Sequence, residues 1–257
     1  MVERFRVAVI GGGFAISLQA AMACGFTPEN EVDAGADVDA AAVADATPVG
    51  PLRACTADPA LLGCFLFDDD TTDGSIQANV VNTATVSFEA GIAGSAAVFE
   101  ADDQFTIADS SFNSSNAMTI EAWVKWREAS LMPAVQLIID KDGQFAVRID
   151  SMGVVSCLGA GSTEAPNDPL GLGLWTHVAC VFDSDRGWSI LINGQTVALG
   201  VANGGLASGL STPAEIGGNA PFVANDSHFL GTLDNLLIWN TARTEEQICE
   251  TAGIDCE

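Results

Sequence analysis

The feature that most constrains the fold is a series of short runs rich in β-branched and aromatic residues, broken by glycine, asparagine and aspartate. Runs of this kind at short intervals predict an all-β protein. The clearest pair is "WSILINGQTVALG", in which Asn193-Gly194, a strong signal for a β-hairpin, separates two strand-like runs. The predicted strands are residues 64–68, 85–88, 96–100, 105–108, 118–126, 136–141, 145–150, 154–160, 175–183, 188–194, 195–200, 214–218 and 233–240.

One short helix is predicted near the C-terminus. Thr244 precedes two glutamates and Gln247, which is the order of a capping box, and Gly253 follows where such a helix would end. Many short strands with a single helix indicate a two-sheet antiparallel sandwich or jelly roll. No internal repeat is visible.

The N-terminal stretch "VAVIGGGFAISLQAAMAC" fits two different structures. A dinucleotide-binding turn needs a third small residue, but after Gly11 and Gly13 that position is Ile16, and no strand pattern follows. A secretory signal needs basic residues, an apolar core and small residues before the cleavage point. Arg4 and Arg6, an uncharged run up to residue 23 and the ending Ala-Met-Ala supply all three. We therefore predict a signal peptide over residues 1–23.

Cys24, which follows the predicted cleavage point, resembles the acylated cysteine of bacterial lipoproteins. The match departs from the lipoprotein pattern at Ala21, where leucine is usual, so plain secretion is the alternative. The chain has seven cysteines, and setting Cys24 aside leaves six, which suits three disulfides. Export is expected in either case.

Residues 24–54 are predicted to be an acidic, disordered tether. Alanine, aspartate, glutamate, valine and proline dominate this segment, which has no aromatic residue after Phe26. Such a composition buries too little apolar surface to offset the entropy of ordering. The folded domain is then expected over residues 55–257.

The formal net charge of −25 argues against nucleic acid as a partner. Nine basic residues stand against 34 acidic ones, and the basic residues form no patch. After the signal, no apolar run approaches the roughly 20 residues that span a bilayer. The expected link to a membrane is the N-terminal lipid alone.

The strand motifs resemble a known family in their order along the chain. "MTIEAWVKW", "LWTHVACVFDSDRGWSILINGQTV" and "FLGTLDNLLIWNTARTEEQI" are similar to segments of laminin G-like domains of the concanavalin A-like lectin/glucanase superfamily, in the bacterial form related to pentraxins. The resemblance covers about residues 60–253. It implies a jelly roll of two packed antiparallel sheets, an architecture that hosts lectins, hydrolases, lyases and adhesion modules.

The catalytic pattern of the related glucanases is missing. Those enzymes use Glu-x-Asp-x-x-Glu on one strand, whereas here Glu100-Ala101-Asp102 is followed by Phe105 in the third position. His177 lies in the strand motif "WTHV", where a structural role is expected, and His228 stands alone. We expect that the protein is not an enzyme.

Binding of a glycan or another cell-surface ligand is the preferred function, with a structural or protein-adhesion module as the alternative. A glycan hydrolase or lyase is the least favoured. The chain has no tyrosine, and Trp123, Trp175, Trp188 and Trp239 occupy strand positions of the resemblance, where packing in the core is expected. Trp126, at the end of its strand, is the tryptophan most expected to be exposed. The candidate ligand-binding residues are Trp126, Asn167, Asp168, Asn225 and Asp226.

The resemblance also implies a structural calcium, which in many members ties the first strand region to an aspartate of the last strand. Hard oxygen donors suit this ion. The candidates here are Asp234, an acid of the "DDD" cluster such as Asp68 or Asp70, and the carbonyl near Gly94. A solvated acidic face is the alternative.

The disulfide pairing is likewise implied by the resemblance. Cys180 matches a position where pentraxins keep a cysteine, but their partner position falls in "MTIEAWV", which has none. Cys157, on a strand predicted to neighbour that of Cys180, is therefore the partner by hypothesis. Because the first and last strands of this fold lie side by side, the preferred terminal pairs are Cys64–Cys249 and Cys55–Cys256. Local pairing, Cys55–Cys64 and Cys249–Cys256, is the alternative. We expect an exported protein, either an envelope lipoprotein or a secreted one.

Overall fold

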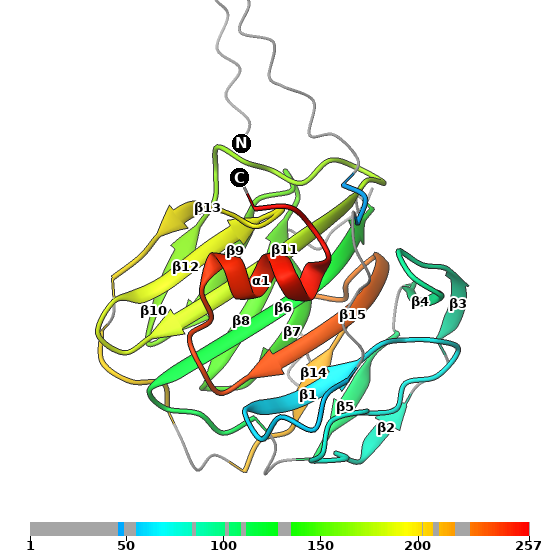
Figure 1. The fold of residues 1–257 in the computed structure, drawn as a ribbon, viewed down its shortest axis with the longest axis horizontal. Coiled ribbons are helices and arrows are strands. Elements are labelled where there is room, and N and C mark those ends of the chain that lie inside the picture. The colour runs from blue at the N-terminus through cyan, green and yellow to red at the C-terminus, as the bar shows by residue number, and fades with distance from the viewer. Residues whose placement is uncertain are drawn as a thin grey trace, which may run out of the picture. The chain divides into compact units, whose positions relative to one another are not determined.

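Two antiparallel sheets packed face to face form the fold, as the strand pattern predicts (Figure 1). The computed structural model describes residues 46–48, 55–83, 86–100, 103–108, 112–127, 135–201, 203–207, 211–218 and 227–256. All of these lie within one compact unit, residues 40–257. The fold class expected from the sequence, an antiparallel β sandwich with one short helix, is confirmed.

The larger sheet, called sheet A here, has eight strands and carries the helix. In spatial order the strands are β13 (Gln195–Leu199), β12 (Gly187–Ile192), β11 (Trp175–Asp183), β6 (Ala117–Trp126), β15 (Gly231–Trp239), β4 (Ser95–Phe99) and β3 (Ser87–Ala90), with β1 (Leu61–Phe65) paired to β15. The first and last strands are therefore neighbours, as expected.

The second sheet, sheet B, has seven strands. In spatial order they are β10 (Gly161–Glu164), β9 (Val155–Gly159), β8 (Phe145–Asp150), β7 (Val135–Lys141), β14 (Ala214–Ile216), β5 (Phe105–Ile107) and β2 (Val81–Thr83). The sequence pattern did not indicate β2 and β10, because "VNT" and "GSTE" are short and polar. Their pairing with β5 and β9 makes them strands.

The core lies between the sheets and follows from the period of two in each strand. In β6, alternate residues from Met118 to Trp126 join the main hydrophobic cluster, whereas Glu121 and Trp123 face outward from sheet A. Phe182 and Trp188, from β11 and β12, pack together in the same core with ring centroids 5.1 Å apart.

The Asn193-Gly194 turn joins β12 to β13, as predicted. Both residues have positive φ, 49° and 79°, which is the backbone requirement of a type I′ hairpin turn. A side chain at Gly194 would also collide with Cys249 Sγ, which lies against this turn. The turn is therefore constrained by its own geometry and by the segment packed on it.

Helix α1 (Glu245–Ala252) lies across the outer face of sheet A (Figure 1). Its predicted caps are confirmed: Thr244 Oγ1 accepts from the Gln247 amide, the Gln247 side chain accepts from the Thr244 amide, and Gly253 ends the helix at φ +68°. Ile248 packs on Ala179 and Val181 of β11. This packing buries part of the outer face of sheet A.

Candidate functional site

A β-bulge in the last strand builds one corner of the molecule. Asp234 of β15 is opposite Trp123 of β6, but the next paired residue is Leu237, opposite Glu121. The bulge contains Asn235, whose φ is 49°, and the next residue, Leu236, has its side chain in the core. Asp234 thus lies where the partner of β15 changes from β4 to β1.

The same corner collects the segments that flank β1 and β4. Asp68 follows the end of β1, and the loop of residues 91–94 precedes β4. Asp68 Oδ1 accepts from the Ser95 amide at 3.0 Å. Asp234 Oδ2 accepts from the amides of Ile92 at 2.8 Å and Ala93 at 3.3 Å. We call Asp68, residues 91–95 and Asp234 the acidic corner.

Glycines allow the two carboxylates to approach this loop. Gly94 has φ +66°, and a Cβ there would collide with Asp68 Oδ1. A Cβ at Gly91 would collide with Asp234 Oδ2. The sequence-predicted grouping of Asp68, Gly94 and Asp234 is therefore found together in space.

Two carboxylates set the electrostatics of the acidic corner. Burial raises the pKa of Asp234 to about 7, and the Asp68 carboxylate adds to this rise, against the lowering effect of the Ala93 and Ile92 amides. Among the described residues, no group of three or more His, Cys, Asp or Glu side chains is placed to hold a metal ion. Two carboxylates are present, so further donors would be backbone carbonyls and water, which calcium accepts.

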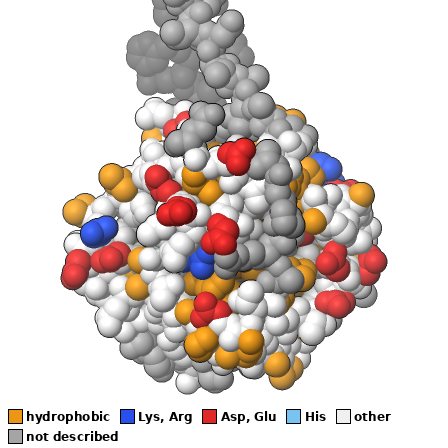
Figure 2. All heavy atoms as spheres, in the orientation of Figure 1, with side chains coloured by type: hydrophobic (Ala, Val, Ile, Leu, Met, Phe, Trp, Pro, Cys, Tyr) orange, Lys and Arg blue, Asp and Glu red, His pale blue; other side chains and the backbone are white. Residues whose placement is uncertain are grey.

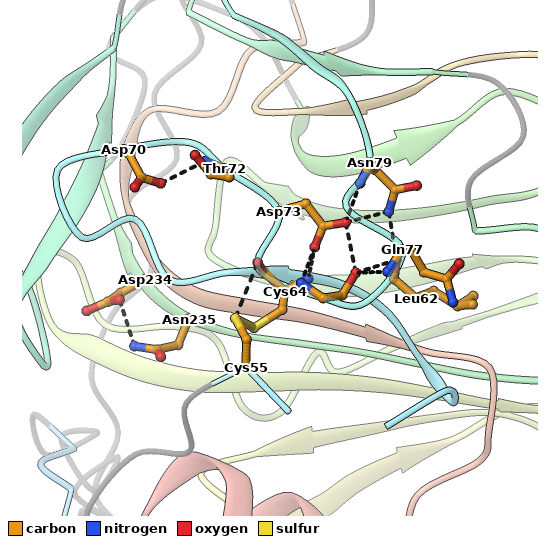
Figure 3. Close-up of a disulfide and its surroundings, with 11 residues drawn as sticks. Cys55, Leu62, Cys64, Asp70, Thr72, Asp73, Gln77, Asn79, Asp234 and Asn235 are labelled. Atoms are coloured by element: carbon orange, nitrogen blue, oxygen red, sulfur yellow. Dashed lines mark hydrogen bonds between the residues drawn. A yellow bond between two sulfur atoms is a disulfide. The ribbon is translucent and has the colours of Figure 1, made fainter. Parts of the chain in front are cut away.

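Asp70 is directed elsewhere. Its side chain is exposed and accepts from the Thr72 amide at 2.8 Å, within its own loop (Figure 3). Asp73, which the sequence analysis passed over, organises that loop instead. Its carboxylate accepts from the Cys64 amide at 2.8 Å, from the Ser75 amide and hydroxyl, and from the Asn79 amide and side chain. These hydrogen bonds give Asp73 a structural role that does not depend on a ligand.

The preferred pairing of the terminal cysteines is wrong, and the local alternative is confirmed. The disulfides are Cys55–Cys64, with Cα atoms 5.8 Å apart, and Cys249–Cys256, with Cα atoms 5.9 Å apart. The predictions Cys64–Cys249 and Cys55–Cys256 fail because Cys249 is on α1 rather than on β15. The helix places Cys249 against Gly194 at the β12–β13 turn, whereas Cys64 pairs in register with Leu237 of β15.

The predicted pair Cys157–Cys180 is confirmed, with Cα atoms 6.0 Å apart. Cys157 is on β9 of sheet B and Cys180 on β11 of sheet A, so the two strands are not neighbours in one sheet. Both side chains lie in the main hydrophobic cluster. This disulfide joins the two sheets through the core.

The expected exposure of Trp126 is wrong. Its side chain is 3% exposed and belongs to the core, because the inward alternation of β6 continues to its last residue. Gly173 donates to the Trp126 carbonyl, and Gly153 lies against the ring, so the 153–173 region closes over the strand end. Trp126 is therefore not available for stacking on a sugar.

The other candidate ligand residues are on loops. Asn167 is exposed and Asp168 half-buried in the loop after β10, and neither is among the residues that line the groove beside α1 or the hollow on sheet B. Asn225 and Asp226 lie outside the described residues, as does Cys24. Of the predicted tether, residues 46–48 are described, and the Ala46 amide donates to the Trp175 carbonyl at 3.0 Å.

A buried polar network lies between α1 and sheet A. Glu121 Oε1 accepts from Trp239 Nε1 at 2.8 Å and lies 3.5 Å from Arg243 Nε, and the Arg243 guanidinium stacks on the Trp239 ring. His177 Nε2 is 3.6 Å from Glu121 Oε2, but burial lowers the pKa of His177 to about 3, so the imidazole is neutral. The expected structural role of His177 agrees with this burial.

Concave surfaces occur on both sheets of the described part of the molecule. A groove of about 460 Å³ lies beside the start of α1, where Val181, Arg186, Leu199 and Thr244 are among its lining residues. On the face that carries α1, acidic side chains are scattered and basic ones are few (Figure 2). A hollow of about 310 Å³ is bordered by β7, β8 and β9 of sheet B. No helix in the described part of the chain is long and apolar enough to cross a membrane.

The chain belongs to the concanavalin A-like lectin/glucanases superfamily, whose family model matches residues 99–249, more than half of its length. The family expected from the strand motifs is therefore confirmed. No curated protein sequence matches the chain significantly.

Several solved structures that share this fold are named as binding domains. Domain 4 of AbnA, a GH43 extracellular arabinanase from Geobacillus stearothermophilus in complex with arabinotriose, is 20% identical with a TM-score of 0.59, covering 75% of this chain and 98% of that one. The binding domain of Paraclostridial Mosquitocidal Protein 1 is 12% identical with a TM-score of 0.56, over 73% and 50%. Trypanosoma rangeli sialidase with 2,3-difluorosialic acid is 17% identical with a TM-score of 0.52, over 77% and 33%. At these identities the likeness shows the fold alone.

Proposed function

We propose that this protein is a non-catalytic carbohydrate-binding module that is exported and displayed on an acidic tether. The observation that carries the proposal is the match over 98% of domain 4 of AbnA, a structure solved with arabinotriose. That domain corresponds in extent to the β sandwich here, so the shared unit is the sandwich itself. The six cysteines paired as three disulfides support an oxidising location.

The absence of the glucanase pattern supports a non-catalytic role. Glu100, the first acid of the nearest sequence match, is exposed and pairs with Arg127 at 3.0 Å, and Asp102 lies outside the described residues. A general acid and a nucleophile on one strand would have to converge on a sugar.

We further propose that calcium binds in the acidic corner, through the carboxylates of Asp68 and Asp234 and carbonyls of the 91–95 loop. The ion would fix the start of β4 to β1 and β15 and would not take part in chemistry. Calcium is then expected to raise the melting temperature of the protein, and Asp234→Asn to remove this increase. Asp70→Asn is the matched control, because Asp70 is directed to Thr72. An equal calcium response in the Asp234→Asn protein would contradict the site.

A protein partner is the second candidate, favoured by one observation. Leu199 and Val201, at the edge of sheet A, are each 79% exposed. Such apolar exposure on an edge strand can mark a contact surface.

The test is binding of the purified protein to a glycan array, in calcium and again in chelator. Hits on a coherent family of glycans support the carbohydrate-binding proposal. Binding that persists in chelator shows that glycan recognition does not require calcium. No glycan binding in either condition would overturn the proposal and favour the protein partner.

A further inference from the structure

The outer face of sheet B carries a row of side chains that crosses four strands. Asp140 of β7 is opposite Glu215 of β14 on one side and Ala146 of β8 on the other, and Ala146 is opposite Leu158 of β9. The neighbouring residue Ile139 faces the core. Because side chains alternate along a strand, the row with Asp140 points away from the core.

This row borders the 310 Å³ hollow. Asp140, Ala146 and Leu158 all line it, together with Gly143 and Gly159. At the two glycines, which have no side chain, the backbone itself forms part of the rim. The hollow therefore combines an apolar surface, from Ala146 and Leu158, with a carboxyl group at one side.

The carboxyl group of Asp140 is buried beside another acid. Asp140 is 8% exposed, its side chain shares a hydrogen bond with Asp142, and no donor among the described residues reaches its Oδ2. Gln144, which also lines the hollow, is 2% exposed, and its Oε1 likewise lacks a partner while its Nε2 donates to the Ser114 carbonyl. Buried polar atoms of native proteins are rarely left unpaired. Two unpaired acceptors at one hollow call for a ligand that supplies hydroxyl donors.

The charges around the hollow argue for a neutral ligand. Burial and the Asp142 carboxylate raise the pKa of Asp140 to about 7, and Glu215 stands across the strand pair. Lys141, which also lines the hollow, is fully buried, and its alternation with Asp140 turns it toward the core side. The nearest outward basic residue along β8, Arg148, pairs with Glu164. Asp140 is the acid among the residues that line the hollow, and an anionic sugar would meet its carboxyl group, so uncharged hydroxyls are favoured.

We propose that the hollow beside Asp140 is a saccharide subsite, in which a neutral sugar ring packs on Ala146 and Leu158 and donates hydroxyl hydrogen bonds to Asp140 and Gln144. The inference rests on the proposed carbohydrate-binding function and gives it a location and a ligand class. A sugar ring suits the hollow because it presents C–H groups on one face and hydroxyls at its rim.

The experiment is calorimetric titration of the full-length protein with neutral oligosaccharides, beginning with arabinotriose, and with 3′-sialyllactose as the acidic comparison. Asp140→Ala removes the carboxyl group, and Ala146→Phe fills the hollow from its surface. Asp140→Asn keeps an acceptor oxygen. Asp185→Ala, in the exposed turn between β11 and β12, is the matched control. Thermal melting of each variant establishes that it is folded.

The subsite predicts that Asp140→Ala and Ala146→Phe each weaken binding of a neutral oligosaccharide about tenfold or more, the loss expected for a buried hydrogen bond with its apolar contact. Asp140→Asn should stay within about threefold of the original affinity, and the control should be unchanged. Oligosaccharide binding that none of the hollow variants alters overturns the subsite and leaves the carbohydrate-binding function standing. Tighter binding of the acidic sugar overturns the ligand class, and no binding of any sugar overturns both proposals.

Discussion

Each sheet has a buried acid on its outer face, and the two acids differ in the side chains that surround them. Glu121 on sheet A is fully buried beneath α1, where it accepts from Trp239 and lies against Arg243. Asp140 on sheet B is almost as buried, but no donor reaches its Oδ2, and the side chain beside it, with which it shares a hydrogen bond, is a second acid, Asp142. The first arrangement compensates a buried charge and the second does not.

The difference separates structure from function in this fold. A buried acid with an arginine, an indole and a helix packed over it attaches that helix to the sheet. A buried acid that no donor reaches lowers the stability of the folded protein, and features of this kind are expected at functional sites. We therefore assign the helix-covered face of sheet A to stability and the outer face of sheet B to ligand binding.

The largest expected effect comes from breaking the sheet A network. Glu121→Ala would leave the charge of Arg243 and the Trp239 N–H without their buried acceptor, which should cost about 3–5 kcal/mol in the free energy of unfolding. Urea denaturation measures this loss. Glu100→Ala removes an exposed pair with Arg127 and should cost less than about 1 kcal/mol. Equal losses in the two variants would contradict a structural role for Glu121.

The next effect concerns the link between the two faces. The Cys157–Cys180 disulfide closes 23 residues and joins sheet B to sheet A, so replacing both cysteines with alanine should cost about 3 kcal/mol. The Cys249–Cys256 disulfide closes only 7 residues, and its removal should cost about 2 kcal/mol. Denaturation of the two double variants gives the order. A larger loss from the terminal disulfide would show that α1 depends on it more than the sandwich depends on its central link.

The smallest effect has the opposite sign and lies on sheet B. Because the pKa of Asp140 is raised to about 7 in the folded protein, the folded state holds a proton that the unfolded state releases near pH 4. Stability therefore falls as pH rises from about 4 to about 7. Asp140→Asn should remove this share of the decline and stabilise the protein by about 1–3 kcal/mol at pH 8, with no gain at pH 4.

Thermal melting across this pH range measures the gain, with Asp185→Asn as the exposed control. If the Asp140→Asn protein is more stable and still binds sugar, the charge of Asp140 lowers stability, whereas sugar binding needs only its acceptor oxygen. Destabilisation at pH 8 would show that Asp140 has a structural partner.

Features set by neighbours in the chain were predictable from the sequence. The Asn193-Gly194 turn and the caps at Thr244 and Gly253 depend on local backbone geometry, and each was predicted correctly. The grouping of Asp68 and Asp234, which are far apart in the sequence, was instead implied by the family resemblance, in which a calcium ties the first strand region to the last strand. It needed no knowledge of side-chain positions.

Features set by packing across the fold were not predictable in this way. Trp126 ends its strand, and only the segment closing over it shows that it is buried. The terminal disulfides depend on the direction in which α1 leaves β15. Asp140 lies at the end of the apolar run "QLIIDK", and the sequence does not show whether its side chain is solvated, paired with a cation or placed at a hollow.

The most direct test of ligand binding on sheet B is a map of amide chemical-shift changes when the protein is titrated with a neutral oligosaccharide that it binds. We expect the changes on residues 140–146 and 158–159 of sheet B, with α1 and the outer face of sheet A unaffected. Changes gathered on α1, on the groove at its start or on Asn167 and Asp168 alone would contradict it.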